Sequence, residues 1–100
     1  MSIRHIVMWK LGTDVPEEKA RQAEEMRQAL EELIGVVPSL RTLTVRANSL
    51  FDGQNFDVVL ESVFDDAEGL AAYASHPAHV EAGKVIKLYS VDRVAVDYEF

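Results

Sequence analysis

The sequence lacks cysteine altogether, which excludes disulfides and thiolate chemistry. It also lacks a basic cluster, because its ten Lys and Arg residues are scattered among seventeen Asp and Glu residues and leave a net charge of −7. Nucleic acids are bound largely through basic side chains that neutralise phosphates, so we expect no nucleic-acid or anionic-membrane partner. The five glycines are scattered too, which excludes a phosphate-binding loop or a dinucleotide fingerprint, and we expect no cofactor.

Long apolar runs are also missing. No stretch approaches the ~20 apolar residues that a membrane-spanning helix needs. The N-terminal segment from Met1 to Trp9 lacks the charged region, the long apolar region and the cleavage site of a signal peptide. We therefore expect a cytoplasmic protein. With 100 residues and 48% hydrophobic content, the chain should form one globular domain over residues 1–100.

What the sequence does contain is a clear succession of apolar periodicities. Alternation with a period of two predicts four strands, at residues 3–11, 40–47, 56–64 and 93–100. Helical spacing predicts a helix from 16 to about 34 and a broken helix in two pieces, from 67 to about 75 and from 77 to 88. This order is the α+β, ferredoxin-like βαββαβ pattern. We expect a four-stranded antiparallel sheet with its helices on one face.

The first predicted strand has apolar residues on both faces. Val7 and Trp9 point to one side, and Ile6 and Met8 point to the other. Because the helices would cover only one face of the sheet, a second copy of the chain is expected to cover the other. We therefore predict a homodimer formed by sheet-to-sheet packing, in which each subunit keeps a cleft between its own sheet and its helices.

The segment Ala72–Val80 carries two of the three histidines of the chain. The residue before a proline is pushed away from helical angles, so His76 should sit at a break, and Pro77 can open the next helix. Tyr73 would then end one helix while His79 lies in the first turn of the next, where the positive end of the helix dipole disfavours imidazolium. A phenol beside a neutral imidazole can act as an acid/base pair. In the structural alternative, His79 packs or caps the junction and Tyr73 belongs to the core.

His5 lies on the same face of the first strand as Val7 and Trp9, which directs it toward the predicted cleft. Together with Tyr73 and His79 it would suit proton abstraction beside a carbonyl, as in an aldol or isomerisation step. The alternative is a core histidine that is satisfied by a hydrogen bond. Hydrolysis is disfavoured because no activated Ser or Cys is evident. No metal site is predicted, since the sequence has no ligand pattern of known spacing.

Three runs of the sequence resemble the stress-responsive dimeric α/β-barrel (Dabb) family, and together they span essentially the whole chain: His5–Lys10, Tyr73 with His76–Val80, and the closing Val96–Tyr98. Members of that family are dimers of ferredoxin-like subunits, so the resemblance implies a dimeric α/β barrel. It also implies a protein that binds a small apolar or polyketide-like molecule between sheet and helices, with an unassigned physiological role.

One plant branch of the family closes a linear tetraketide thioester to olivetolic acid by an aldol condensation that uses no cofactor. The resemblance to this branch implies His79 as the base, Tyr73 as the acid or oxyanion donor, and His5 as the residue that orients them. The walls that would select a ligand are expected to include Trp9, Met26, Leu30, Phe64 and His76. The same positions belong to the motif of the whole family, so a cyclase or isomerase and a binding protein without turnover both stay open. A cofactorless oxygenase is a third alternative, by analogy of fold alone.

Overall fold

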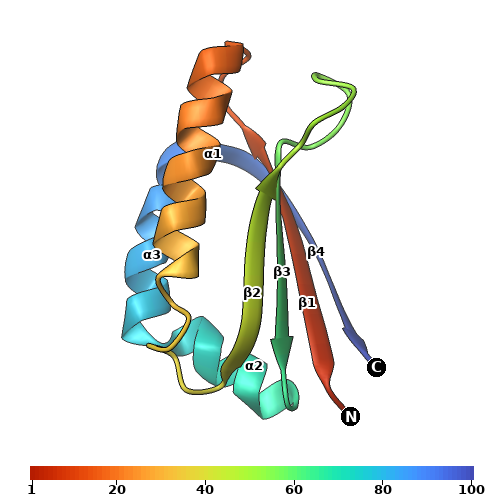
Figure 1. The fold of residues 1–100 in the computed structure, drawn as a ribbon, viewed down its shortest axis with the longest axis vertical. Helices are drawn as coiled ribbons and strands as arrows, with labels where there is room; N and C mark the ends of the chain where they lie inside the picture. The colour runs from red at the N-terminus through yellow and green to blue at the C-terminus, as the bar shows by residue number, and fades with distance from the viewer.

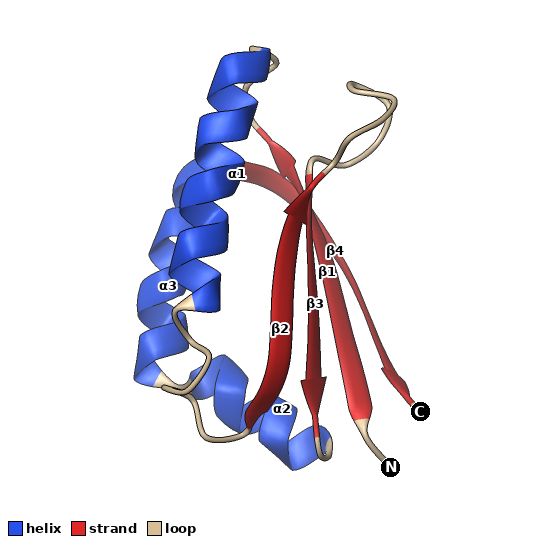
Figure 2. Cartoon of the chain, viewed as in Figure 1, coloured by secondary structure: helices blue, strands red, loops and turns tan.

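Four strands form one antiparallel sheet in a computed structural model that describes residues 1–100. The elements are, in chain order, β1 (Ile3–Leu11), α1 (Pro16–Glu31), β2 (Leu40–Ala47), β3 (Val58–Phe64), α2 (Ala67–Ser75), α3 (Pro77–Tyr89) and β4 (Ser90–Glu99). The strand order is β2-β3-β1-β4, and the three helices lie on one side of the sheet (Figure 1; Figure 2). This arrangement confirms the predicted ferredoxin-like α+β fold. None of the helices combines the length and the apolarity needed to cross a membrane.

Several element boundaries differ from the prediction, and the end of α1 and the start of β4 differ by about three residues each. α1 ends at Glu31 rather than near Ile34, because Leu33 and Ile34 hydrogen-bond to carbonyls three residues back instead of four. β4 begins earlier than predicted, at Ser90 rather than Arg93, since it pairs with the end of β1 directly after α3. The regular alternation of β4 starts only at Arg93, so periodicity alone could not detect its first pairs.

A buried carboxylate marks the start of β3, which begins at Val58 rather than at Phe56 as predicted. The buried Asp57 side chain accepts the Leu11 N–H at 2.8 Å and pairs with the Lys19 ammonium at 3.1 Å. It therefore ties the end of β1 to α1 just before β3 begins. A buried charge needs such partners, because taking it out of water is expensive.

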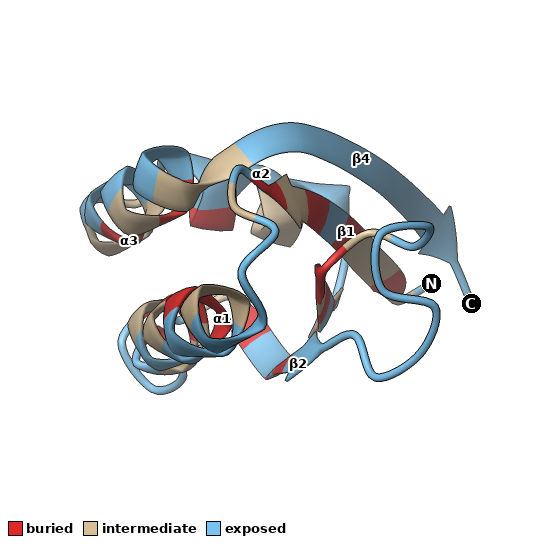
Figure 3. Ribbon diagram, turned by 90° about the horizontal axis from the view of Figure 1, so that it is seen from above, coloured by how far each residue is buried: buried red, intermediate tan, exposed pale blue.

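The core fills the space between the helices and the inner face of the sheet, where Figure 3 shows the buried residues gathered. Along β1, Val7 and Trp9 are buried, and Val7 lies opposite Leu60 of β3. Met26 and Leu30 of α1 belong to the same buried cluster. The predicted inner face of β1 is therefore confirmed as the side that meets the helices.

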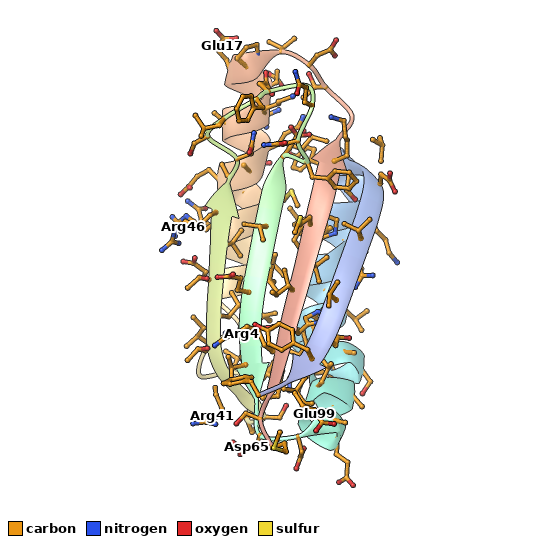
Figure 4. All side chains as sticks on the ribbon, turned by 90° about the vertical axis from the view of Figure 1, so that its right-hand side faces the viewer. Arg4, Glu17, Arg41, Arg46, Asp65 and Glu99 are labelled. Carbon is orange, nitrogen blue, oxygen red and sulfur yellow. The ribbon has the colours of Figure 1, made fainter.

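The outer face of the sheet has no helix over it, and Figure 4 looks onto this face. Strand register places Ile6 and Met8 of β1 beside Val96 and Val94 of β4, and Val59 of β3 flanks Met8 on the other side. These side chains are half-buried or exposed, and Val96 is 63% exposed. An apolar stripe, made of these five residues, therefore runs across three strands of the uncovered face.

Candidate functional site

A proline-imposed break between α2 and α3 positions the site. His76 leaves the helical region with φ −63° and ψ 135°, and Pro77 opens α3, as predicted. The His76 imidazole caps α3, since its Nδ1 accepts the Ala78 N–H at 3.0 Å. The chain turns at this point and brings the rings of Tyr73 and His79 to 4.4 Å between centroids.

Tyr73 stands in the last turn of α2 and is only 2% exposed. Its ring packs against Phe64, with 5.0 Å between centroids, and its hydroxyl has no hydrogen-bond partner in the protein. Gln22 Oε1 is the one side-chain polar atom that is both fully enclosed and without a hydrogen-bond partner. The Tyr73 hydroxyl also lacks a partner, so it is not fully enclosed and keeps some access to solvent. Burial raises the pKa of Tyr73 to about 12, so the phenol is a proton donor at neutral pH.

His79 lies in the first turn of α3 and is half-buried. Its Nδ1 lies 3.1 Å from the Ala74 carbonyl oxygen, which can only accept, so Nδ1 carries the proton and Nε2 keeps its lone pair. Burial lowers the pKa of His79; the bond to Ala74 opposes this shift, and the charges of His5 and Arg93 add to it. The predicted direction is confirmed, but the main cause is burial rather than the helix N-terminus.

His5 projects from β1 toward Tyr73, with 6.5 Å between ring centroids. Its Nδ1 is hydrogen-bonded to the carboxylate of Asp97, which stands opposite it in the register of β1 and β4. A carboxylate accepts, so the Nδ1–H of His5 donates and the pair fixes the orientation of the ring. Sequence reasoning missed Asp97, because alternation groups it with Arg93 on one face of β4 without showing which residue of β1 it meets.

A cavity of about 210 Å³ opens between the inner face of the sheet and α3. Its apolar lining comes from both layers and comprises Val7, Trp9, Leu30, Leu60 and Ile86. Its polar lining comprises His5, Tyr73, His79, Lys87, Ser90 and Arg93. The cavity therefore joins an apolar floor to a donor phenol, two imidazoles and two cations.

Five of the eight predicted site residues line this cavity: His5, Trp9, Leu30, Tyr73 and His79. The structure does not bring the other three to it. Met26 and Phe64 are fully buried in the core, where Phe64 supports the Tyr73 ring, and the Nδ1 of His76 is used as a helix cap. No group of three or more His, Asp or Glu side chains lies close enough together to hold a metal ion.

Three polar residues of the cavity, Lys87, Ser90 and Arg93, were not predicted as site residues. Ser90 was missed because β4 was expected to begin three residues later. The sequence gives no signal that singles out Lys87 or Arg93, since charged residues on helices and edge strands usually face water. Their shared position could be found only from the pairing of β4 with β1, which is a contact between distant parts of the chain.

A family model and several known proteins match this chain over almost its whole length. The family model of the stress-responsive A/B barrel domain matches residues 3–100. An uncharacterised protein of Streptomyces coelicolor is 33% identical over 98 residues, which cover 98% of this chain and 99% of that protein. The olivetolic acid cyclase of Cannabis sativa is 24% identical over 102 residues, and the matched region covers 98% of this chain and 96% of the cyclase.

A solved structure is also similar to this chain over almost its whole length. It is a dimeric protein of unknown function and ferredoxin-like fold from Bacteroides fragilis, with a TM-score of 0.88 and 37% sequence identity. The similarity covers 99% of this chain and 96% of that one. The structure comparison therefore agrees with the ferredoxin-like fold described above.

The lowered pKa of His79 predicts a specific loss of stability in mild acid. In the unfolded chain His79 takes up its proton near pH ~6.5, whereas the folded protein takes it up only at lower pH. The folded state then binds fewer protons, so the His79 contribution to the free energy of unfolding is fully present above pH ~6.5 and is lost as the pH falls below it.

Urea unfolding at about pH 7.5 and about pH 5.5 tests this prediction. The free energy of unfolding should fall less between these two pH values in His79→Gln than in the wild type. An NMR titration midpoint of His79 at or above ~6.5 would contradict this assignment.

Proposed function

Because the chain belongs to the stress-responsive A/B barrel domain family, we propose that it binds a small molecule in the cavity between its sheet and its helices. The observation that carries this proposal is the Tyr73 hydroxyl, a buried donor at the cavity with no protein partner. A ligand oxygen that accepts this proton would replace the solvent at the hydroxyl, and a hydrogen bond of this kind contributes ~0.5–1.5 kcal/mol net. The Nε2 lone pair of His79 offers an acceptor beside it.

The dimensions of the cavity favour a small ligand with an apolar body. Pockets for drug-sized ligands measure ~300–1,000 Å³, whereas this one measures about 210 Å³. An engineered protein cavity of roughly 150 Å³ holds benzene, so a single ring with one polar substituent is of suitable size. The apolar lining from Trp9, Leu30 and Leu60 would contact the ring, and the polar substituent would meet Tyr73 and His79.

A cofactor-independent cyclase or isomerase is the second candidate, and the tautomer of His79 favours it. Its free Nε2 could take a proton from a carbon beside a ligand carbonyl, while Tyr73 donates to the enolate oxygen that forms. The enolate carbon would attack a second carbonyl, and the resulting alkoxide would recover the proton from His79. His5, held by Asp97, would orient Tyr73. The similarity to olivetolic acid cyclase supports this reaction class.

We further propose a homodimer in which the outer sheet faces of two copies pack together. The apolar stripe supports this arrangement, because Met8, Val94 and Val96 are exposed in a single chain. Contiguous exposed apolar patches on globular proteins mark interaction sites. The similar structure from Bacteroides fragilis is described as dimeric, which agrees with the proposal. The cytoplasmic location expected from the sequence stays a prediction.

Removing the Tyr73 hydroxyl should weaken binding without destabilising the fold. Tyr73→Phe keeps the ring contacts with Phe64 and His79 and deletes a hydroxyl that has no protein partner, so the free energy of unfolding should change by less than about 1 kcal/mol. Benzamide is a suitable probe, because it offers a carbonyl to Tyr73 and an amide N–H to His79. Its Kd, measured by NMR titration, should rise about three- to tenfold in this variant.

Tyr89→Phe is the matched control and should behave in the opposite way. The Tyr89 hydroxyl donates to Glu25 and does not line the cavity, so its loss should lower the free energy of unfolding by about 1 kcal/mol and leave benzamide binding unchanged. Equal losses of stability in the two variants, with equal benzamide affinity, would refute the proposed role of Tyr73.

His79→Ala separates a catalyst from a binding protein. With a linear tetraketide thioester as the substrate, loss of the base should lower kcat about 10²- to 10⁴-fold and leave most of the binding affinity. A parallel fall of affinity and turnover, or a wild-type protein that never turns the thioester over, would remove the support for His79 as a base.

A charge on the outer face of the sheet should dissociate the proposed dimer. Val96→Lys would place an ammonium in the apolar stripe, and a buried unpaired charge is strongly unfavourable. Sedimentation should then show a monomer that remains folded. Leu88→Lys is the control, because Leu88 is 72% exposed on α3 and lies on the other side of the molecule. A dimer that survives Val96→Lys would exclude this interface.

A further inference from the structure

The charge of the cavity is opposite to the charge of the chain. Seventeen of the 100 residues are acidic, yet no Asp or Glu lines the cavity. Two cations do line it, Lys87 from α3 and Arg93 from β4, and neither forms an ion pair. We infer that the cavity binds the oxyanion of a small organic acid between Lys87 and Arg93, with the apolar body of the acid on the cavity floor. This inference rests on the proposed binding function and adds the charge of the ligand to it.

Half of the ten basic residues form ion pairs, and Lys87 and Arg93 belong to the half that does not. Lys84, three residues before Lys87 on α3, pairs with Glu81 at 2.9 Å. On α1, Arg21 and Arg27 each pair with two glutamates of the same helix. Arg4, Lys10 and Arg46 also form no ion pair, but Lys87 and Arg93 are the two cations that line the cavity together.

Two acids of β4, Asp92 and Asp97, contact other groups. Asp97 is bonded to His5, and Asp92 accepts the backbone N–H of Arg93 at 2.9 Å. The guanidinium of Arg93 forms an ion pair with neither carboxylate. A guanidinium presents a planar fork of donors that matches the two oxygens of a carboxylate or phosphate. The charge of Arg93 also lowers the pKa of His79, so its field reaches the imidazole at the site.

The two cations stand on different layers of the fold. Lys87 lies in the last turn of α3, and Arg93 stands opposite Trp9 in the register of β1 and β4. An oxyanion between them would therefore be held from the helix side and from the sheet side. The floor below, with Trp9, Leu60 and Ile86, suits an apolar body rather than a free inorganic ion.

Three single-ring probes test the inference: benzoate, neutral benzamide of the same shape, and phenyl phosphate. Their Kd values would be measured by NMR titration of the full chain at constant ionic strength, following the shifts of cavity residues. The wild type should bind one of the two anions at least about tenfold more tightly than benzamide. The better of the two anions identifies the oxyanion as a carboxylate or a phosphate.

The variants Lys87→Met and Arg93→Met keep an apolar side chain of similar reach and remove the charge. Each should weaken binding of the preferred anion about three- to tenfold and change benzamide binding by less than about twofold. Lys84→Met is the matched control, because it removes the same charge from the same helix at a position outside the cavity. It should leave all three Kd values unchanged.

The outcomes separate this inference from the proposed binding function. If benzamide binds in a Tyr73-dependent manner and neither anion binds more tightly, the binding proposal survives and the anion site is excluded. A preference for the anion that persists in both Met variants also excludes Lys87 and Arg93 as its ligands. If none of the three probes binds at millimolar concentration, both the inference and the binding proposal fail.

Discussion

The break imposed by Pro77 is the constraint on which the site depends. In one continuous helix, residues six apart would lie about 120° apart around the axis, so Tyr73 and His79 would not face each other. The break ends α2 at Ser75 and leaves the Ala74 carbonyl without a partner inside the helix. His79 donates to that carbonyl, which fixes its tautomer and leaves the Nε2 lone pair free. A backbone restriction at one residue thus sets the protonation chemistry of a side chain two positions later.

β1 adds a second constraint, because it serves two surfaces at once. His5 and Trp9 face the cavity, whereas Ile6 and Met8 face the uncovered side of the sheet. A shift of the strand by one residue would exchange the two sets, so its pairing with β3 and β4 fixes the cavity and the outer stripe together. The same pairing with β4 brings Asp97 to His5. The proposed ligand site and the proposed dimer surface therefore depend on one strand register.

Local patterns in the sequence predicted the fold and the junction between α2 and α3. They could not predict contacts between residues that lie far apart in the sequence. The alternation of β1 and the rule for residues before proline correctly placed His5, Tyr73 and His79 around one cavity. Asp97 and Arg93 were not found, because alternation assigns residues to a face but does not pair one strand with another. The expected contact of His76 with a ligand has no support in the structure, since a nearby backbone N–H uses its ring nitrogen. The direction of the His79 pKa shift was predicted, but its main cause, burial, depends on packing that no local pattern contains.

The central claim is that the Tyr73 hydroxyl obtains its hydrogen-bond partner from a ligand. The chain has three tyrosines, so a spectrum with ¹³C at the Cζ atom of tyrosine should contain three signals. Tyr89 donates to Glu25, and Tyr98 accepts from Arg4 on the outer face at 3.2 Å, which makes them internal references. We expect a mixture of single-ring acids and amides to move the Tyr73 signal and leave the Tyr89 signal in place. A Tyr73 signal that stays fixed, or three signals that move together, would contradict the account.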